Sequence, residues 1–184
     1  MNKKRMIMAV LALVMIIGAG VGATFAFLLT SSQPVINTFT VGNVQIQLSE
    51  TTGSEYQLVP GTVVEKDPTL TVLAGSDTCW LFFRVEETSG IENFVIYAAE
   101  ESWTPLAGID GVYYRQVEAN FEDVSFSLLK DNQFLVPYAV TEEQLAQLEQ
   151  PHQLIFTGYA VQADGMETPE EAWQHLFDTG VADR

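Results

Sequence analysis

Residues 79–85 read Cys-Trp-Leu-Phe-Phe-Arg-Val, an apolar run that carries one charge, Arg84. A strand with one solvated face would show a polar side chain at every second position, and this run does not. A strand of this kind is expected to be covered on both faces. The run therefore predicts a central core strand. It also favours burial of Cys79 as a small hydrophobic side chain over pairing with another chain.

Shorter strands, separated by frequent turns, are predicted before this run. Residues 37–48 alternate between apolar and polar side chains, with a break at Gly42-Asn43 that a β-bulge or a tight turn would produce. A second strand region, residues 58–64, is interrupted by the turn pair Pro60-Gly61, and a third covers residues 70–73. Short strands separated by frequent turns are typical of an all-β fold.

The pattern continues after the central run. Strands are predicted at residues 94–98, 112–117, 124–128, 134–136 and 154–161. Residues 130–133, Lys-Asp-Asn-Gln, resemble the loop of a hairpin that joins 124–128 to 134–136, and Pro137 makes the second of these an edge strand. Trp103 and Leu106 are expected in a loop.

Two short helices are marked by their N-terminal residues. Thr141 and Gln144 have the spacing of a capping box, and Pro151 limits that helix. Thr168 is a candidate N-cap before a proline at the first helical position. The expected fold is an antiparallel, jelly-roll-like β-sandwich with two short helices.

The first 26 residues have the pattern of a cleavable signal peptide. Three basic residues, Lys3, Lys4 and Arg5, precede an uncharged apolar segment that contains several glycines. Small residues at Thr24 and Ala26 favour cleavage after Ala26, with cleavage after Ala23 as the alternative. The mature protein, a single domain of residues 27–184, would then begin at Phe27 outside the cytoplasm. An uncleaved membrane anchor is the other interpretation of this segment.

The charge is strongly acidic, with 24 acidic residues, 8 basic residues and a formal net charge of −16. Nucleic acid and anionic lipid headgroups would be repelled by such a surface, so membrane contact is expected only through the leader before cleavage. The single cysteine rules out an intramolecular disulfide.

No motif for catalysis, metal binding or cofactor binding stands out. A metalloprotease helix needs two histidines one turn apart beside a glutamate, whereas this chain offers only Glu171 and His175 on one predicted helix, with His152 elsewhere. No serine elbow or phosphate loop is present. Paired acids at 86–87, 100–101, 122–123 and 142–143 lack the alternating spacing of a calcium loop. We therefore expect no catalytic residues, no metal and no cofactor.

The chain resembles the TasA/camelysin group of exported bacterial proteins. The resemblance rests on the basic leader, the segment Gly22 to Phe27, the Asn-Thr-Phe-Thr-Val-Gly segment at 37–42, and Pro60-Gly61 followed by Lys66-Asp67-Pro68. Looser support comes from residues 158–162 and 171–173. The resemblance implies that a SipW-type signal peptidase cleaves the leader and that the mature protein is a jelly-roll sandwich at the cell surface. It also implies a subunit of biofilm matrix fibres that donates its N-terminal strand to a neighbour. The arm of this chain lacks the acidic residue common in that group.

The expected function is therefore that of a secreted, non-enzymatic subunit that assembles with copies of itself or with related subunits. Two alternatives stay open: an extracellular metalloprotease resembling camelysin, and a monomeric adhesin that binds through loops around Trp103, Tyr113 and Tyr114. In the fibre hypothesis residues 27–40 form the assembly arm, with apolar side chains to fill sites on a neighbour: Leu29, Val35, Ile36 and Phe39.

Overall fold

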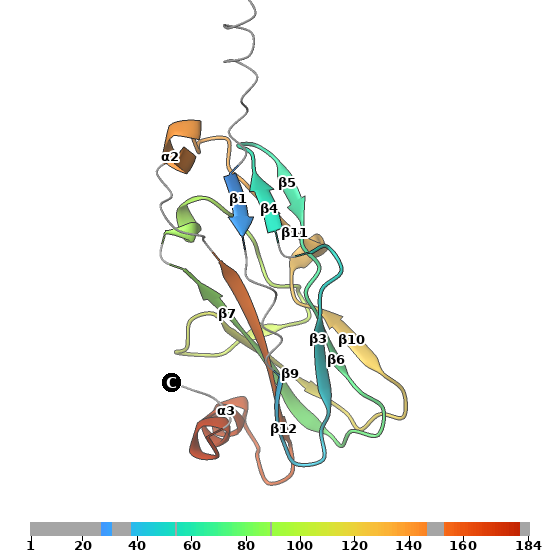
Figure 1. Cartoon of the computed structure of the whole chain (residues 1–184). Helices are drawn as coiled ribbons and strands as arrows, with labels where there is room; N and C mark the ends of the chain where they lie inside the picture. The colour runs from blue at the N-terminus through green and yellow to red at the C-terminus, as the bar shows by residue number, and fades with distance from the viewer. Residues whose placement is uncertain (1–26, 31–37, 54, 89, 147–152, 181–184) are drawn as a thin grey trace, which may run out of the picture.

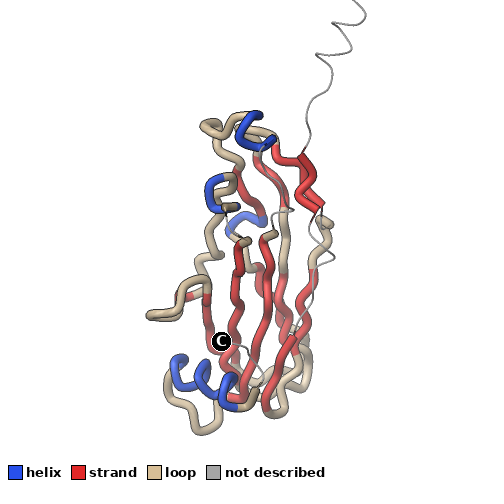
Figure 2. Tube along the Cα trace, turned by 60° about the vertical axis from the view of Figure 1, so that its left-hand side comes forward, coloured by secondary structure: helices blue, strands red, loops and turns tan. Residues whose placement is uncertain are grey.

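The computed structural model describes residues 27–30, 38–53, 55–88, 90–146 and 153–180. Within these ranges the chain is mostly β-structure, as the sequence predicts, and it has two α-helices. Figures 1 and 2 show strands running along the length of the molecule, with α-helices near its two ends. The predicted cleavage residues Thr24 and Ala26 lie outside the described residues.

The largest sheet has the strand order β2-β12-β7-β9-β8. Its centre is β7 (Cys79–Glu87), which confirms the prediction of a central strand at that run. Antiparallel neighbours flank it, β12 (Leu154–Gln162) and β9 (Val112–Val117). The edges are β2 (Thr38–Val41) and the two-residue strand β8 (Thr104–Pro105).

The two faces of β7 are both buried, which explains its lack of alternation. Leu81 and Phe83 belong to one apolar core cluster, whereas Trp80 and Phe82 belong to another on the opposite face of the sheet. Cys79 is fully buried, as expected, and burial raises the pKa of its thiol to about 12. A thiol in this state is a packing group rather than a reactive one.

A second sheet covers the first face. Its strand order is β10-β6-β3, formed by β10 (Val124–Ser127), β6 (Thr69–Val72) and β3 (Ile46–Ser49). Leu70 of β6 faces Gly158 of β12 so closely that a Cβ at Gly158 would lie 2.7 Å from Leu70 Cδ1. The two sheets therefore pack face to face as in a β-sandwich.

The opposite face of the large sheet is covered by α3 (Pro169–Asp178). Thr168 is its N-cap, as predicted, because its side chain accepts a hydrogen bond from the backbone of Glu171. Trp173 packs on Phe82 and Tyr159, with ring centroids 5.2 Å apart in each case. No helix in the described part of the chain is long and apolar enough to cross a bilayer.

Two strand pairs lie at the other end of the molecule, which we call the upper end after its place in Figure 1. In the first pair β1 (Phe27–Thr30) is antiparallel to β4 (Glu55–Leu58), and in the second β5 (Val63–Glu65) is antiparallel to β11 (Gln133–Leu135). The strands β4, β5 and β11 share an apolar cluster with the 3-10 turn η1 (Ile91–Asn93) and with α2 (Glu142–Ala146).

The capping box predicted for α2 is present. The backbone of Thr141 donates to Gln144 Oε1 at 2.8 Å, and the backbone of Gln144 donates to Thr141 Oγ1 at 3.2 Å. Leu145, which is 1% exposed, anchors the helix in the upper cluster.

The predicted hairpin between residues 124–128 and 134–136 is wrong, because β10 pairs with β6 and β11 pairs with β5. The intervening 3-10 turn η2 (Lys130–Asn132) has positive φ at Asp131 and Asn132, which redirects the chain to the upper end. The strand predicted at 94–98 is also wrong, since that segment makes only an isolated bridge from Ile96 to Leu135.

The expectation of a purely antiparallel sandwich needs one correction. β2 pairs with β12 in parallel, aligning Phe39 with Tyr159. Residues 37–48 are likewise not one strand, since β2 and β3 belong to different sheets. The chain passes between them at Gly42, whose φ of 87° suits glycine.

Candidate functional site

The candidate site is the pair of edges on which the N-terminal arm lies. Phe27 is the first residue of β1, and Leu29 of that strand is aligned with Tyr56 of β4. Phe39 lies in β2, on the edge of the large sheet. Val35 and Ile36, also predicted for the arm, lie outside the described residues.

The arm contacts two strands that are distant in sequence and belong to different sheets. β1 pairs with β4 at the upper end, whereas β2 pairs with β12 of the large sheet. Both contacts are backbone ladders, which depend little on the identity of the paired strand. The same pairings could in chemical terms be made by the arm of a second copy.

The strand β4, which pairs with β1, is held in place by Tyr56. Its ring packs edge-on against Phe134, with centroids 5.7 Å apart, and its hydroxyl oxygen lies 2.5 Å from the carbonyl oxygen of Gly53. The same hydroxyl contacts Glu50 Oε1. Burial, followed by the neighbouring Glu50 carboxylate, raises the pKa of Tyr56 well above its usual range.

A buried ion pair lies beneath Tyr56. Lys66 Nζ lies 2.7 Å from Glu50 Oε1 and 3.0 Å from Oε2, and the two side chains are only 6% and 7% exposed. The ammonium group also lies 4.8 Å from the ring centroid of Tyr56 and 5.5 Å from that of Phe156. Lys66 therefore joins the loop after β3, the strand β4 and the core strand β12.

Asp67 adds a second set of bonds beside this pair. Its Oδ1 accepts from the backbone of Thr51 and of Thr52, both at 2.9 Å. Burial alone would raise the pKa of this carboxyl, but hydrogen bonds from the Thr51 side chain and from both backbone groups lower it to about 2. We call Glu50, Thr52, Tyr56, Lys66 and Asp67 the polar cluster.

Sequence reasoning missed the role of this cluster. In the sequence Lys66 and Asp67 stand out only in the segment Lys66-Asp67-Pro68 that carries the resemblance to TasA/camelysin proteins, because charged residues between strands are usually solvated. One signal was available: basic residues are scarce in the chain, and one of them directly follows a strand.

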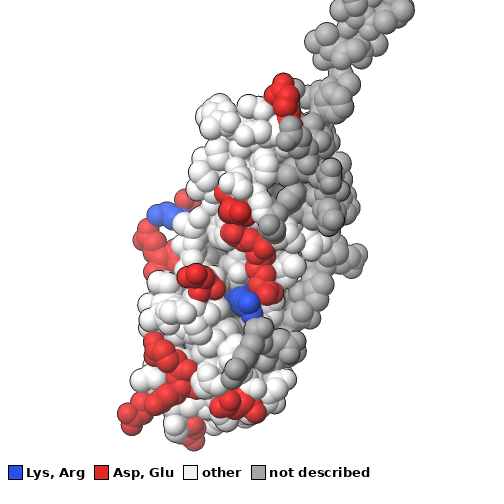
Figure 3. All heavy atoms as spheres, turned by 90° about the vertical axis from the view of Figure 1, so that its left-hand side faces the viewer, with Lys and Arg blue, Asp and Glu red and all other residues white. Residues whose placement is uncertain are grey.

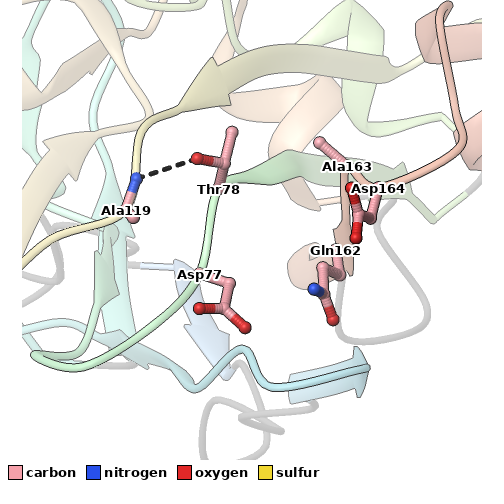
Figure 4. A pocket seen from close by; sticks show the side chains of 6 residues that line it. All are labelled: Asp77, Thr78, Ala119, Gln162, Ala163 and Asp164. Atoms are coloured by element: carbon pink, nitrogen blue, oxygen red, sulfur yellow. Dashed lines mark hydrogen bonds between the residues drawn. The ribbon is translucent and has the colours of Figure 1, made fainter.

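A pocket opens near the corner where the arm joins the sandwich. It has a volume of about 460 Å³ and is lined by Asp77, Thr78, Ala119, Gln162, Ala163 and Asp164. Figure 4 shows Thr78 and Ala119 on one side and Gln162, Ala163 and Asp164 on the other. Asp77 and Gln162 also hold the corner residue Asn43, whose side chain donates to Asp77 Oδ2 at 3.2 Å and whose backbone donates to Gln162 Oε1 at 3.4 Å.

Three of the four acidic pairs considered for calcium have a member that is engaged in another contact. Glu101 Oε1 lies 2.7 Å from Lys130 Nζ, Asp123 accepts from the backbone of Ala74 at 2.8 Å, and Glu86 lies 3.3 Å from Arg84. Figure 3 shows acidic side chains spread along one face with few basic ones among them. Over the described residues, no three His, Cys, Asp or Glu side chains are grouped to hold a metal ion.

The histidine considered as a metal ligand, His175, is half-buried on α3. Its candidate partner Glu171 uses Oε2 to accept from the backbone of Glu167 at 3.2 Å. His152 lies outside the described residues.

The aromatic residues proposed for an adhesive loop are largely internal. Trp103 is 5% exposed, and its indole donates to the carbonyl of Ser127 at 2.8 Å. Its ring packs edge-on against the ring of Phe83. Tyr113 stacks on the Phe83 ring, with centroids 4.9 Å apart. Tyr114 packs against Trp80 with centroids 5.9 Å apart. These contacts make the three residues part of the core packing.

Comparison with family models, curated proteins and solved structures finds no match to this chain.

Proposed function

We propose that the mature protein is an extracellular fibre subunit that assembles by donating its N-terminal arm to a neighbouring copy or to a related subunit. The leader would be removed after Ala26 by a SipW-type signal peptidase, leaving Phe27 as the free N-terminus. The finer topology proposed for the sandwich is a jelly roll, as in the TasA/camelysin proteins that the sequence resembles.

The observation that supports this proposal best is the separate placement of β1. This strand comes from the extreme end of the mature chain, and among the described residues its ladder is made with β4 alone. Exchange of β1 between copies would replace one set of backbone bonds by an identical set. Such an exchange costs little enthalpy and converts monomers into a continuous assembly.

The acidic composition supports a further expectation about assembly. Subunits with a net charge of −16 or below repel one another, and salt or partial protonation of carboxylates reduces that repulsion. We therefore expect faster assembly at high salt and as the pH falls toward the sequence pI of about 4.2.

The test compares a mature chain that starts at Phe27 with one that starts at Thr38. The shorter chain keeps β2 and lacks β1, because β2 begins at Thr38. Light scattering and electron microscopy at mildly acidic pH should show filaments for the longer chain only. Equal filament formation by the two chains would overturn strand donation by β1.

A full-length variant tests whether assembly depends on β1 itself and not only on the length of the chain. Leu28→Pro removes one backbone donor from β1 and should weaken assembly strongly, whereas Gln174→Ala on the exposed face of α3 should leave it unchanged. Intact-mass measurement of the exported protein tests the processing step, and a retained leader would contradict it.

A further inference from the structure

The ion pair between Lys66 and Glu50 is an unusual use of a basic residue. The chain has eight basic residues against 24 acidic ones, yet the Lys66 side chain is only 6% exposed. A buried ion pair stabilises a fold little more than apolar residues of the same volume would. Lysine, unlike arginine, can also lose its proton in a buried site and act as a nucleophile.

The amino group of Lys66 and the carboxyl group of Glu50 are held in contact. Lys66 Nζ lies 2.7 Å from one carboxylate oxygen of Glu50 and 3.0 Å from the other, so it faces the carboxyl carbon that both oxygens share. Holding two groups at such a distance raises their effective concentration to about 10⁵ M or more in well-oriented intramolecular reactions. An uncatalysed condensation that is negligible in water can then proceed within a folded protein.

Aromatic rings surround the amino group of Lys66. The rings of Tyr56 and Phe156 lie 4.8 Å and 5.5 Å from Nζ and exclude water from it. The Tyr56 hydroxyl contacts Glu50 Oε1, where it can polarise the carboxyl group, and Thr52 Oγ1 lies 3.1 Å from that hydroxyl.

We propose that Lys66 and Glu50 condense to an intramolecular amide bond. A proton passes from Nζ to a Glu50 oxygen and the neutral amine attacks Cδ. A second proton then passes from Nζ to the same oxygen, which leaves as water. The C–N bond forms and a C–O bond breaks, with no oxidant, reductant or cofactor. Tyr56 acts as the general acid that hydrogen-bonds to the carboxyl oxygen during this step.

The bond would close a loop at the base of the acceptor strand. Glu50 and Lys66 are 16 residues apart, and β4 lies between them. A covalent link there would keep β4 attached to the core even when a paired strand is pulled. The proposal does not depend on fibre formation, because the reaction occurs within one chain.

The primary test is the mass of the wild-type protein. Mature protein is unfolded in denaturant, and its intact mass is compared with the mass calculated from its sequence. We expect a mass lower by one water, and a protease digest in which the peptide containing Lys66 is joined to the peptide containing Glu50. The full calculated mass together with two separate peptides would show an ion pair only and would overturn the proposal.

Two variants test which residues take part in the reaction. Lys66→Arg keeps the charge but offers no comparable nucleophile, so its mass should equal the calculated value. Tyr56→Phe keeps the ring and removes the hydroxyl, so we expect a several-fold smaller linked fraction at equal times after synthesis. An unchanged linked fraction in Tyr56→Phe would overturn the role of Tyr56. A lost water in Lys66→Arg would overturn the assignment to Lys66.

Discussion

The sandwich body and the upper end are built by different interactions. In the body, β7 and β12 each run for nine residues and pair along their whole length, and their side chains fill apolar clusters on two faces. At the upper end, β1 and β4 have four residues each and β5 and β11 have three. Strands this short are marginal without support.

The difference lies in what holds each region together. Burial of aromatic and aliphatic area supports the body, a term that is large and insensitive to pH. The upper end adds the polar cluster to its small apolar core, so part of its stability depends on charges and on individual hydrogen bonds. The strand β1 pairs with β4 in this region, whose stability depends on individual polar contacts.

The largest effect is expected from the core of the body. Phe83 is fully buried, and its ring packs against Trp103 at 4.8 Å and Tyr113 at 4.9 Å. Phe83→Ala should lower the free energy of unfolding by about 4 kcal/mol, because it removes buried area and leaves a cavity. Urea denaturation measures this loss.

The matched control for that substitution is Phe121→Ala. Phe121 is 96% exposed, so the same change of side chain should alter the free energy of unfolding by less than about 0.5 kcal/mol. Similar losses in the two variants would show that aromatic burial in the sandwich does not dominate the stability of the body.

The upper end should respond to loss of a charge partner. Lys66→Met leaves the Glu50 carboxylate buried without its ammonium partner, and we expect a loss of about 3 kcal/mol. Hydrogen exchange should show the amides of β4 less protected, while those of β7 change little. Equal loss of protection in both strands would mean that the two regions unfold as one unit.

The double variant Lys66→Met with Glu50→Leu refines this comparison. Replacing both partners removes the unpaired charge, so this variant should be more stable than Lys66→Met alone. A double variant that is less stable than the single one would contradict the view that the cost comes from the buried carboxylate.

Local structure and strand pairing differ in how well the sequence predicts them. The run at 79–85 has no alternation because sheets and helix cover both sides of it, and this pattern correctly predicts β7. The N-cap at Thr168 and the capping box at Thr141 are equally local and were equally predictable. Local periodicity and capping chemistry carry this information.

Strand pairing at the upper end could not be predicted in the same way. Residues 124–128 and 134–136 look like a hairpin because they are close in sequence, but positive φ at Asp131 and Asn132 sends the chain elsewhere. The polar cluster likewise joins residues 16 apart through contacts that leave no periodic signal. Such features depend on tertiary placement.

The corner between the arm and the sandwich should show an intermediate effect. Gly42 has φ 87°, and a Cβ there would lie 2.7 Å from Gln162 Cβ. Gly42→Ala should therefore cost about 2 kcal/mol, from backbone strain and from the steric contact together. Thermal denaturation of this variant and of the wild type measures the loss.

Gly75→Ala separates the two causes. Gly75 has φ 83°, and a Cβ there would meet nothing within 4 Å, so this variant carries the backbone cost alone. We expect Gly42→Ala to be the less stable of the two. Equal stability would show that contact with Gln162 adds nothing at the corner.

The smallest effect is a response of the upper end to acid. The pKa of Asp67 is about 2 in the folded protein, below its ordinary value of 3.8, because hydrogen bonds from Thr51 and Thr52 outweigh the opposing effect of burial. A carboxyl whose pKa is lowered by folding contributes stability above its unfolded pKa and loses that contribution as the pH falls through the folded pKa. The contribution should therefore be complete above about pH 4 and fade toward about pH 2, and solvent screening limits it to about 1 kcal/mol.

Asp67→Asn provides the reference for this measurement, because an amide at that position does not titrate. The difference in unfolding free energy between wild type and Asp67→Asn should be constant near neutral pH and should shrink between about pH 4 and pH 2. Hydrogen exchange of the β4 amides should follow the same curve, while the β7 amides should not. A difference that stays constant down to about pH 2 would mean that the Asp67 carboxylate does not support the loop after β3.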